Sequence, residues 1–198
     1  MVTLTPPTGP RGKPVTRRTL LSRRDALTEE ARAEASVKIA ERAASQLEGL
    51  EAGKIVGLYA TKGSEVETRV LDREAQKRGL IVVYPRVVEG TRELEFCIAN
   101  VDDLVVARFG LREPAAFERL VKIEDIELFF VPGVAFDREG GRIGWGRGHY
   151  DATLAKAKPE ARRIGIAFEC QVVERVEREA HDARMTAIVT EVTTHVVL

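Results

Sequence analysis

Apolar residues return every three or four positions in the N-terminal part of the chain, which is the period of an amphipathic helix. The repeat runs from Leu20 to Leu47. Within it, Thr28 is followed by Glu29 and Glu30, which is typical of a helix N-cap followed by acidic residues in the first turn. The pattern therefore predicts two helices, over residues 14–27 and 29–48.

Beyond residue 53 the pattern changes to short, nearly continuous apolar runs. Such runs are typical of strands that are buried on both faces of a parallel sheet, and they predict strands at residues 54–60, 80–85, 94–98, 126–131, 163–168 and 187–190. Helices are predicted over residues 65–79, with Val66, Val70, Leu71 and Ala75 inward, and over residues 150–158, and a loop is predicted over residues 111–116. The alternation of strands and helices indicates an α/β protein with a mostly parallel sheet covered on both faces.

The length and composition of the chain exclude several classes of protein. The chain has 198 residues, of which 44% are hydrophobic and 31% charged, so one folded domain over residues 13–198 is expected. Residues 1–12 contain prolines and glycines without an apolar stretch, and we expect a flexible tail rather than a secretory signal.

No apolar run approaches the ~20 residues needed to cross a membrane. Two cysteines, Cys97 and Cys170, are too few for a disulfide framework, and a cytoplasmic protein is expected.

The chain carries 31 basic and 31 acidic residues, a formal net charge of +0. This balance argues against a general nucleic-acid-binding surface, which usually has a large basic excess. It leaves open a local anion site, because a net charge says nothing about where the charges lie.

Candidate chemistry concentrates in residues 131–151, which follow an apolar strand and open a helix. The segment contains Gly140, Gly141, Gly144, Gly146 and Gly148. Glycines allow backbone N–H groups to approach a phosphate closely, and Arg142 and Arg147 add donors suited to phosphate oxygens. Asp151 provides a carboxylate for Mg²⁺. The spacing matches neither a P-loop nor the dinucleotide fingerprint, so the loop indicates a phosphate site of another type, or a tight connection only.

The residues FVPGVAFD (130–137) and GRIGWGRGHYD (141–151) closely resemble the signature of the 5-formyltetrahydrofolate cyclo-ligase family. Further elements of that family occur in order: Lys13 and Arg17 with Arg23, Arg24 and Leu27, then GSEVET (63–68), YPR (84–86), FGLREP (109–114), GIAFECQ (165–171), His181-Asp182 and Thr190-Glu191. The resemblance therefore covers nearly the whole chain after the tail.

The resemblance implies a three-layer α/β/α sandwich of the NagB/RpiA/CoA-transferase-like type. It implies conversion of 5-formyltetrahydrofolate to 5,10-methenyltetrahydrofolate, with ATP as co-substrate, Mg²⁺ as cofactor, and release of ADP and phosphate through a phosphorylated formyl group. The partners would be ATP and a reduced folate, without membrane or nucleic acid, and a monomer is favoured.

The resemblance also assigns roles to individual residues. Lys13, Arg142, Arg147 and Tyr150 would be catalytic, and Asp151 and Asp182 would hold the metal. ATP would contact Lys13, Arg17, Arg142, Ile143, Gly144, Trp145, Gly146, Arg147, Gly148, His149 and Tyr150. The folate would contact Ala60, Glu65, Trp145, Gly146, Arg147, Gly148 and His149.

Each of these residue types also has a purely structural use. Lys13 and Arg17 suit a solvated helix face, Glu65 suits the first turn of a helix, and Tyr150 and Asp151 suit a helix start. Three positions depart from the family pattern: His149 replaces the first of two tyrosines, Leu94 stands where methionine is usual, and Thr186 replaces an aspartate. Two alternatives to the cyclo-ligase therefore stay open, an ATP-binding paralogue with another substrate and a non-catalytic nucleotide- or RNA-binding module.

Overall fold

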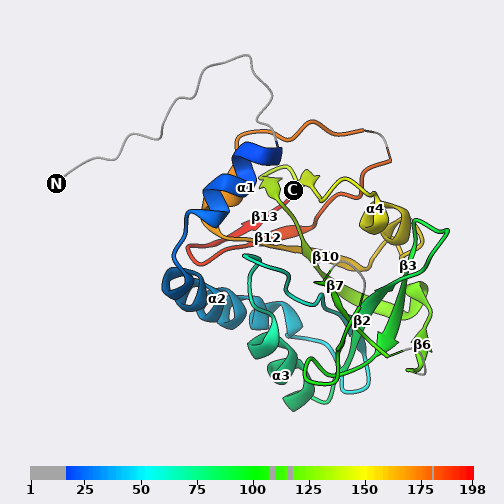
Figure 1. The fold of residues 1–198 in the computed structure, drawn as a ribbon. Helices are drawn as coiled ribbons and strands as arrows, with labels where there is room; N and C mark the ends of the chain where they lie inside the picture. The colour runs from blue at the N-terminus through cyan, green and yellow to red at the C-terminus, as the bar shows by residue number, and fades with distance from the viewer. Residues whose placement is uncertain (1–16, 108–109, 116–117, 180) are drawn as a thin grey trace.

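The computed structural model describes residues 17–107, 110–115, 118–179 and 181–198 (Figure 1). The predicted tail, residues 1–12, and Lys13 lie outside the described residues. The helices are α1 (Arg17–Asp25), α2 (Glu29–Ala44), α3 (Arg69–Lys77) and α4 (His149–Leu154), with 3₁₀ turns at Ser45–Leu47, Ile123–Asp125 and Glu169–Gln171. No helix in these ranges is long and apolar enough to cross a membrane.

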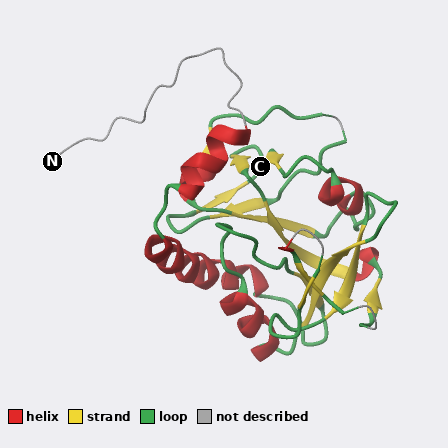
Figure 2. Cartoon of the chain, in the orientation of Figure 1, coloured by secondary structure: helices red, strands yellow, loops and turns green. Residues whose placement is uncertain are grey.

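An eight-stranded sheet forms the centre of the described part of the chain (Figure 2). Its order is β13 (Thr194–Val196), β12 (Ala187–Val189), β10 (Arg162–Ile166), β7 (Ile126–Pro132), β1 (Ile55–Gly57), β2 (Ile81–Val87), β3 (Leu94–Ile98) and β6 (Leu120–Val121). The five strands from β12 to β2 are parallel. At one edge β13 pairs antiparallel with β12, and at the other β3 pairs antiparallel with β2 and β6 pairs antiparallel with β3. The prediction of a mostly parallel sheet is confirmed.

Strand β7 shows why the predicted apolar runs fold as central strands. Leu128 and Phe130 pack in the core on the face covered by α2 and α3, whereas Phe129 and Val131 pack in the core on the opposite face. Because successive side chains of a strand point to opposite faces, a continuous apolar run fills two cores at once. The second face is covered by the short helix α4 and by loops, which completes the three layers (Figure 1).

The helices agree with the predictions in place but not in all their bounds. Thr28 caps α2 by accepting a hydrogen bond from the backbone N–H of Ala31 at 3.2 Å, as predicted. Helix α4 ends at Leu154, not at residue 158, because its last turn tightens into i→i−3 bonds ahead of Pro159.

The predicted helix over residues 65–79 is shorter than expected. It begins only at Arg69, so that Leu71 and Ala75 are buried as predicted but Val70 is 45% exposed and the prediction for it was wrong. Glu65 and Val66 lie in the loop before the helix, although Val66 is buried as expected. Glu65 is therefore not a first-turn acid.

The segment predicted as one glycine-rich loop contains a small second sheet. Strand β8 (Ala135–Asp137) pairs with β9 (Arg142–Ile143) and β11 (Val172–Val173). A separate pair joins β4 (Val105–Val106) to β5 (Arg112–Glu113), and β5 lies where a loop over residues 111–116 was predicted. In the β8–β9 turn, the fully buried Asp137 accepts hydrogen bonds from the N–H groups of Glu139 at 3.0 Å, Gly141 at 2.7 Å and Val176 at 2.8 Å. A Cβ on Gly141 would lie 2.6 Å from Asp137 Oδ2, so glycine is required there for space.

Candidate active site

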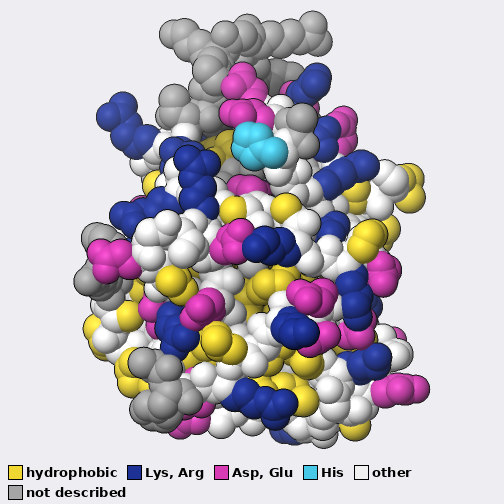
Figure 3. Space-filling view, turned by 90° about the vertical axis from the view of Figure 1, so that its right-hand side faces the viewer, with side chains coloured by type: hydrophobic (Ala, Val, Ile, Leu, Met, Phe, Trp, Pro, Cys, Tyr) yellow, Lys and Arg dark blue, Asp and Glu magenta, His cyan; other side chains and the backbone are white. Residues whose placement is uncertain are grey.

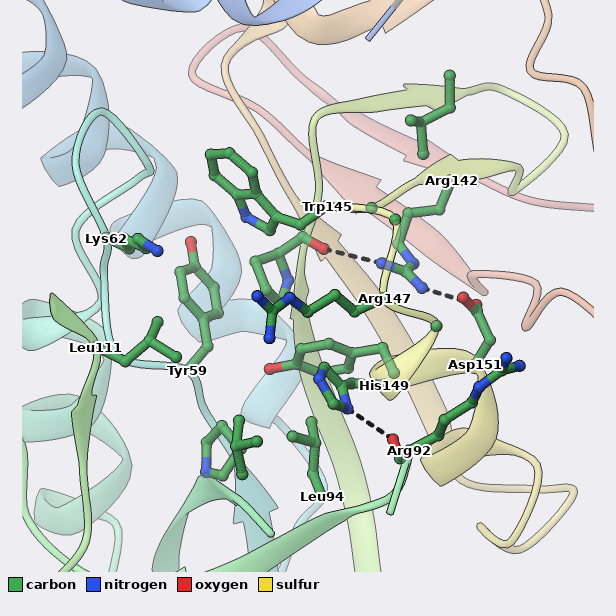
Figure 4. A pocket seen from close by; sticks show the side chains of 18 of the residues that line it. Tyr59, Lys62, Arg92, Leu94, Leu111, Arg142, Trp145, Arg147, His149 and Asp151 are labelled. Atoms are coloured by element: carbon green, nitrogen blue, oxygen red, sulfur yellow. Dashed lines mark hydrogen bonds and ion pairs between the residues drawn. The ribbon is translucent and has the colours of Figure 1, made fainter. Parts of the chain in front are cut away.

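A cavity of about 740 Å³ opens at the carboxyl ends of the central strands, between the loops that follow β1, β2 and β7 and the start of α4 (Figure 4). This is where ligands bind in open α/β sheets. Every predicted site residue that the structure describes lines it: Arg17, Ala60, Glu65, Arg142, Ile143, Gly144, Trp145, Gly146, Arg147, Gly148, His149, Tyr150, Asp151 and Asp182. Lys13 lies outside the described residues.

The glycine loop is attached to helix α1 by one side chain. Arg17 Nε donates a hydrogen bond to the carbonyl oxygen of Gly144 at 2.8 Å, and its guanidinium lies 3.1 Å from where a Cβ on Gly146 would be. Gly146 and Gly148 have φ values of +91° and +69°, a left-handed conformation that favours glycine. The sequence thus places a glycine at each point where the loop turns sharply, and Arg147 reaches into the cavity from between them (Figure 4).

Arg142 and Asp151 form an ion pair on one wall of the cavity. Arg142 Nη2 lies 2.7 Å from Asp151 Oδ1, and the Arg142 side chain is only 4% exposed (Figure 4). Its guanidinium carbon also lies 5.6 Å from the centre of the Tyr150 ring. Arg142 is therefore held inside the wall, where it fixes Asp151, while Arg147 is the arginine of this loop that extends into the open space.

The two predicted metal-binding carboxylates lie on neighbouring segments of this wall. The N–H of Ala183 donates to Asp151 Oδ1 at 3.3 Å, which brings residue 182 beside Asp151, and Asp182 Oδ2 accepts from the N–H of Glu179 at 2.7 Å. Among the described residues no group of three or more His, Cys, Asp or Glu side chains is arranged around a common point. Mg²⁺ usually binds through one or two carboxylates and substrate phosphates and keeps several waters, so two carboxylates facing one cavity are a suitable donor set.

Glu65 supplies a buried carboxylate on the opposite wall. It is 7% exposed, its Oε2 accepts from the N–H of Lys62 at 3.0 Å, and its Oε1 accepts from Trp145 Nε1 at 2.9 Å. Burial raises the pKa of this carboxyl above its ordinary value, and the bonds from Trp145 and Lys62 oppose part of that shift. A buried carboxylate with two directed acceptor oxygens is suited to bind N–H groups of a planar heterocycle.

Trp145 covers Glu65 from the glycine loop. The indole lies between two cationic side chains, with Arg24 at 5.4 Å and Lys62 at 5.8 Å from the ring centre. Arg24 is 2% exposed and donates from Nε to Ser64 Oγ at 2.9 Å. Trp145 is nevertheless 46% exposed, so it is not part of the buried core.

Tyr150 brings a buried hydroxyl to the cavity. Its oxygen has no hydrogen-bond partner among the described residues although it is shielded from solvent, and burial raises the pKa of the phenol. The group is therefore a neutral donor at physiological pH. Tyr150 therefore carries a neutral hydroxyl that no described residue uses as a partner.

His149 lies at the lower edge of the cavity in Figure 4, where its Nδ1 is 2.8 Å from the carbonyl oxygen of Arg92. Leu94, the second departure from the family pattern, lines the same edge. Thr186, the third, lies away from the cavity lining and bonds the backbone of Arg163 through its hydroxyl. The first two departures therefore affect the cavity directly and the third does not.

Several cavity residues were missed from the sequence: Tyr59, Lys62, Arg92, Leu111, Arg112, Glu177 and Glu179. Tyr59 and Lys62 flank Ala60 and could have been found from their position after the first strand. Arg92 carries no such signal, because it follows a surface turn. Basic and acidic side chains are mixed both in this lining and over the face shown in Figure 3.

Comparisons with known proteins relate the whole chain to one family. The model of the 5-formyltetrahydrofolate cyclo-ligase family matches residues 10–191. The 5-formyltetrahydrofolate cyclo-ligase of Mycolicibacterium smegmatis is 31% identical over 187 residues, 91% of this chain and 94% of that protein. The structure of Aquifex aeolicus 5,10-methenyltetrahydrofolate synthetase is 33% identical with a TM-score of 0.74, covering 91% of this chain and 90% of that one. A synthetase of the same name from Mycoplasma pneumoniae, 22% identical, shares the fold with a TM-score of 0.73, over 88% of this chain and 96% of that one.

Proposed function

Because the chain belongs to the 5-formyltetrahydrofolate cyclo-ligase family, we propose that it converts 5-formyltetrahydrofolate to 5,10-methenyltetrahydrofolate, using ATP and Mg²⁺ and releasing ADP and phosphate. The observation that carries the proposal is a single cavity that combines a glycine loop with arginines, two adjacent carboxylates and a separate buried carboxylate, Glu65. Such a cavity offers one end for a triphosphate and another for a heterocyclic ring.

The chemistry explains why both ends belong to one cavity. The formyl oxygen attacks the γ-phosphorus of ATP, and ADP leaves with the electron pair of the broken P–O bond. The N10 amine then attacks the formyl carbon of the resulting iminium phosphate, N10 loses its proton, and phosphate departs to leave the methenyl bridge. The protein must hold the γ-phosphate against the formyl group and balance charge, and positioning with electrostatics supplies most of such catalysis.

At the triphosphate end, Arg17, Arg147 and Lys13 would bind phosphate oxygens, and residues 143–150 would surround them. Arg147 reaches into the cavity (Figure 4), and Arg17 holds the loop through Gly144. Arg142 would act through Asp151, because its guanidinium is already paired there at 2.7 Å. Asp151 and Asp182 would hold Mg²⁺, which when bound neutralises phosphate charge.

At the folate end, Glu65 would accept hydrogen bonds from N–H groups of the pterin, and Ala60, Trp145 and His149 would lie along the ligand. The unpaired hydroxyl of Tyr150 would donate to a substrate oxygen. The monomer favoured from the sequence stays a prediction. The cytoplasmic location expected from the sequence stays a prediction.

The direct test is a spectrophotometric assay of the methenyl product with protein, ATP, Mg²⁺ and 5-formyltetrahydrofolate. Absorbance should grow with wild-type protein, stop without ATP, and fall strongly for Asp151→Asn. If no product forms at high protein concentration, calorimetry with each ligand separates the remaining alternatives. ATP binding without folate binding would indicate a paralogue with another substrate, and strongly salt-dependent RNA binding would indicate a nucleic-acid-binding module.

A further inference from the structure

Trp145 and Glu65 are bound to each other in the cavity that the folate would enter. The indole Nε1 donates to Glu65 Oε1 at 2.9 Å, and Glu65 Oε2 already accepts from the backbone N–H of Lys62 at 3.0 Å. Trp145 is 46% exposed and Glu65 is 7% exposed. The tryptophan therefore separates the carboxylate from solvent, and both carboxylate oxygens are engaged by the protein itself.

Trp145 is flanked by glycines in the loop that carries it. The residue lies between Gly144 and Gly146, and the left-handed conformation of Gly146 and Gly148 is open to glycine without strain. The base of the loop is anchored to α1 by the bond from Arg17 Nε to the carbonyl oxygen of Gly144. Trp145 thus lies between two glycines, one of which is bonded to Arg17.

Two cations stabilise the closed position. Arg24 and Lys62 lie 5.4 Å and 5.8 Å from the indole centre, within the range at which cations are attracted to an aromatic face. Arg24 is buried, and its Nη1 has no hydrogen-bond partner among the described residues, so its charge is poorly solvated and the π face is a favourable neighbour. The closed state is thus held by one hydrogen bond and two ring contacts, each of them weak enough to be exchanged.

We propose that Trp145 is a gate over Glu65, which closes the folate end of the cavity in the substrate-free protein and turns away when a heterocycle with an N–H edge takes over Glu65 Oε1. This inference rests on the proposed function, because it depends on Glu65 being the ring-binding group. The gate makes Trp145 a specificity-determining residue. A ring without N–H donors would displace the indole and leave a buried carboxylate unpaired, which is costly.

Trp145 is the one tryptophan in the chain, so it can be observed without background. Protein labelled with 5-fluorotryptophan should give one ¹⁹F resonance, and this resonance should shift when 5-formyltetrahydrofolate is added. Glu65→Ala removes the acceptor and should shift the substrate-free resonance. The matched variant Glu67→Gln, at an exposed glutamate two residues away, should leave it in place.

Trp145→Phe keeps an aromatic ring but removes the N–H that competes with substrate. Its dissociation constant for 5-formyltetrahydrofolate should fall about two- to tenfold, the range expected for loss of one competing hydrogen bond. A rise or no change would overturn the gate, because a tryptophan that only shapes the cavity weakens binding when it is truncated.

The two proposals fail in different ways. If calorimetry shows that wild-type protein binds 5-formyltetrahydrofolate but the ¹⁹F resonance stays in place, the gate is wrong and the proposed function stands. If the wild-type protein does not bind this folate at all, the proposed function is wrong and the gate falls with it.

Discussion

Arg142 and Asp151 face each other across the start of helix α4, with 2.7 Å between Nη2 and Oδ1. The arginine side chain is 4% exposed and the aspartate 21% exposed, so the pair is shielded on one side and open to the cavity on the other. Because the arginine is buried and the aspartate faces the cavity, we expect the pair to contribute to both stability and activity.

Asp151→Asn should lower both the stability of the protein and its activity. The change leaves the buried guanidinium without its counter-charge, and we expect the free energy of unfolding to fall by about 1–3 kcal/mol, less than for a fully buried pair because Asp151 is partly exposed. The value of kcat/KM should fall by roughly 10²-fold or more, since a group that balances phosphate charge is removed. Urea unfolding and the methenyl assay measure the two effects.

A matched control uses an ion pair of the same length at the surface. Lys156 and Glu93 lie 2.7 Å apart but are 57% and 48% exposed, so Lys156→Gln should cost less than about 1 kcal/mol and leave kcat/KM unchanged. If Asp151→Asn is no worse than Lys156→Gln in either measurement, the Arg142–Asp151 pair has no special role.

Glu65 should give the pH profile of activity an acid limb above the ordinary carboxyl value of 4.5, because burial raises its pKa. Only the ionised form accepts hydrogen bonds at both oxygens, so kcat/KM should decrease as the pH falls through the raised pKa. Glu65→Gln should lower kcat/KM and remove this limb, whereas Glu67→Gln at the exposed neighbouring glutamate should keep it.

The raised pKa of Glu65 affects stability in the opposite direction, so that stability should fall as the pH rises. A carboxyl whose pKa is higher in the folded than in the unfolded protein binds its proton more tightly when folded. The contribution of Glu65 to stability is therefore complete below the unfolded value and is lost as the pH rises through the folded one. Comparing urea unfolding of wild-type and Glu65→Gln across this window checks the sign: the wild type should lose stability relative to the variant as pH increases.

The candidate site was largely predictable because its chemistry lies in one continuous segment. Residues 141–151 carry the loop, the arginines and Asp151, and their order alone places them together at the end of a strand. The partner of Arg142 could not be predicted, since residue types do not reveal that the guanidinium turns into the wall. Likewise, nothing in the sequence pairs Trp145 with Glu65, which is 80 positions away.

The loop before α3 shows why the helix prediction failed. Residues 65–68 read as part of a helix, but their backbone groups are bonded elsewhere: Val66 O accepts from Tyr59 Oη at 3.0 Å, and the N–H of Glu67 donates to Ser36 Oγ at 3.1 Å. Ser36 belongs to α2. Hydrogen bonds to residues distant in sequence thus outweigh the local preference, and a pattern read over a short window contains no sign of them.

Gly141→Ala should be strongly destabilising for lack of space. A Cβ there would lie 2.6 Å from Oδ2 of the buried Asp137, which holds three backbone N–H groups. We expect a loss of about 3 kcal/mol or more, because displacing this carboxylate breaks buried charged hydrogen bonds. Gly49→Ala is the control: Gly49 has a φ of +78° and open space around it, so only backbone strain of about 1 kcal/mol should appear. Equal losses in thermal or urea unfolding would refute the steric argument.

Tyr150→Phe and Tyr59→Phe should change stability in opposite directions although both remove one buried hydroxyl. Tyr150 Oη has no partner among the described residues, so its removal should stabilise the substrate-free protein by up to about 1 kcal/mol while weakening binding of 5-formyltetrahydrofolate by about tenfold. Tyr59 Oη donates to Val66 O at 3.0 Å, so Tyr59→Phe should cost about 1 kcal/mol. Urea unfolding and calorimetry of the two variants distinguish these effects. A loss of stability in Tyr150→Phe as large as that in Tyr59→Phe would show that the Tyr150 hydroxyl is already satisfied without a ligand.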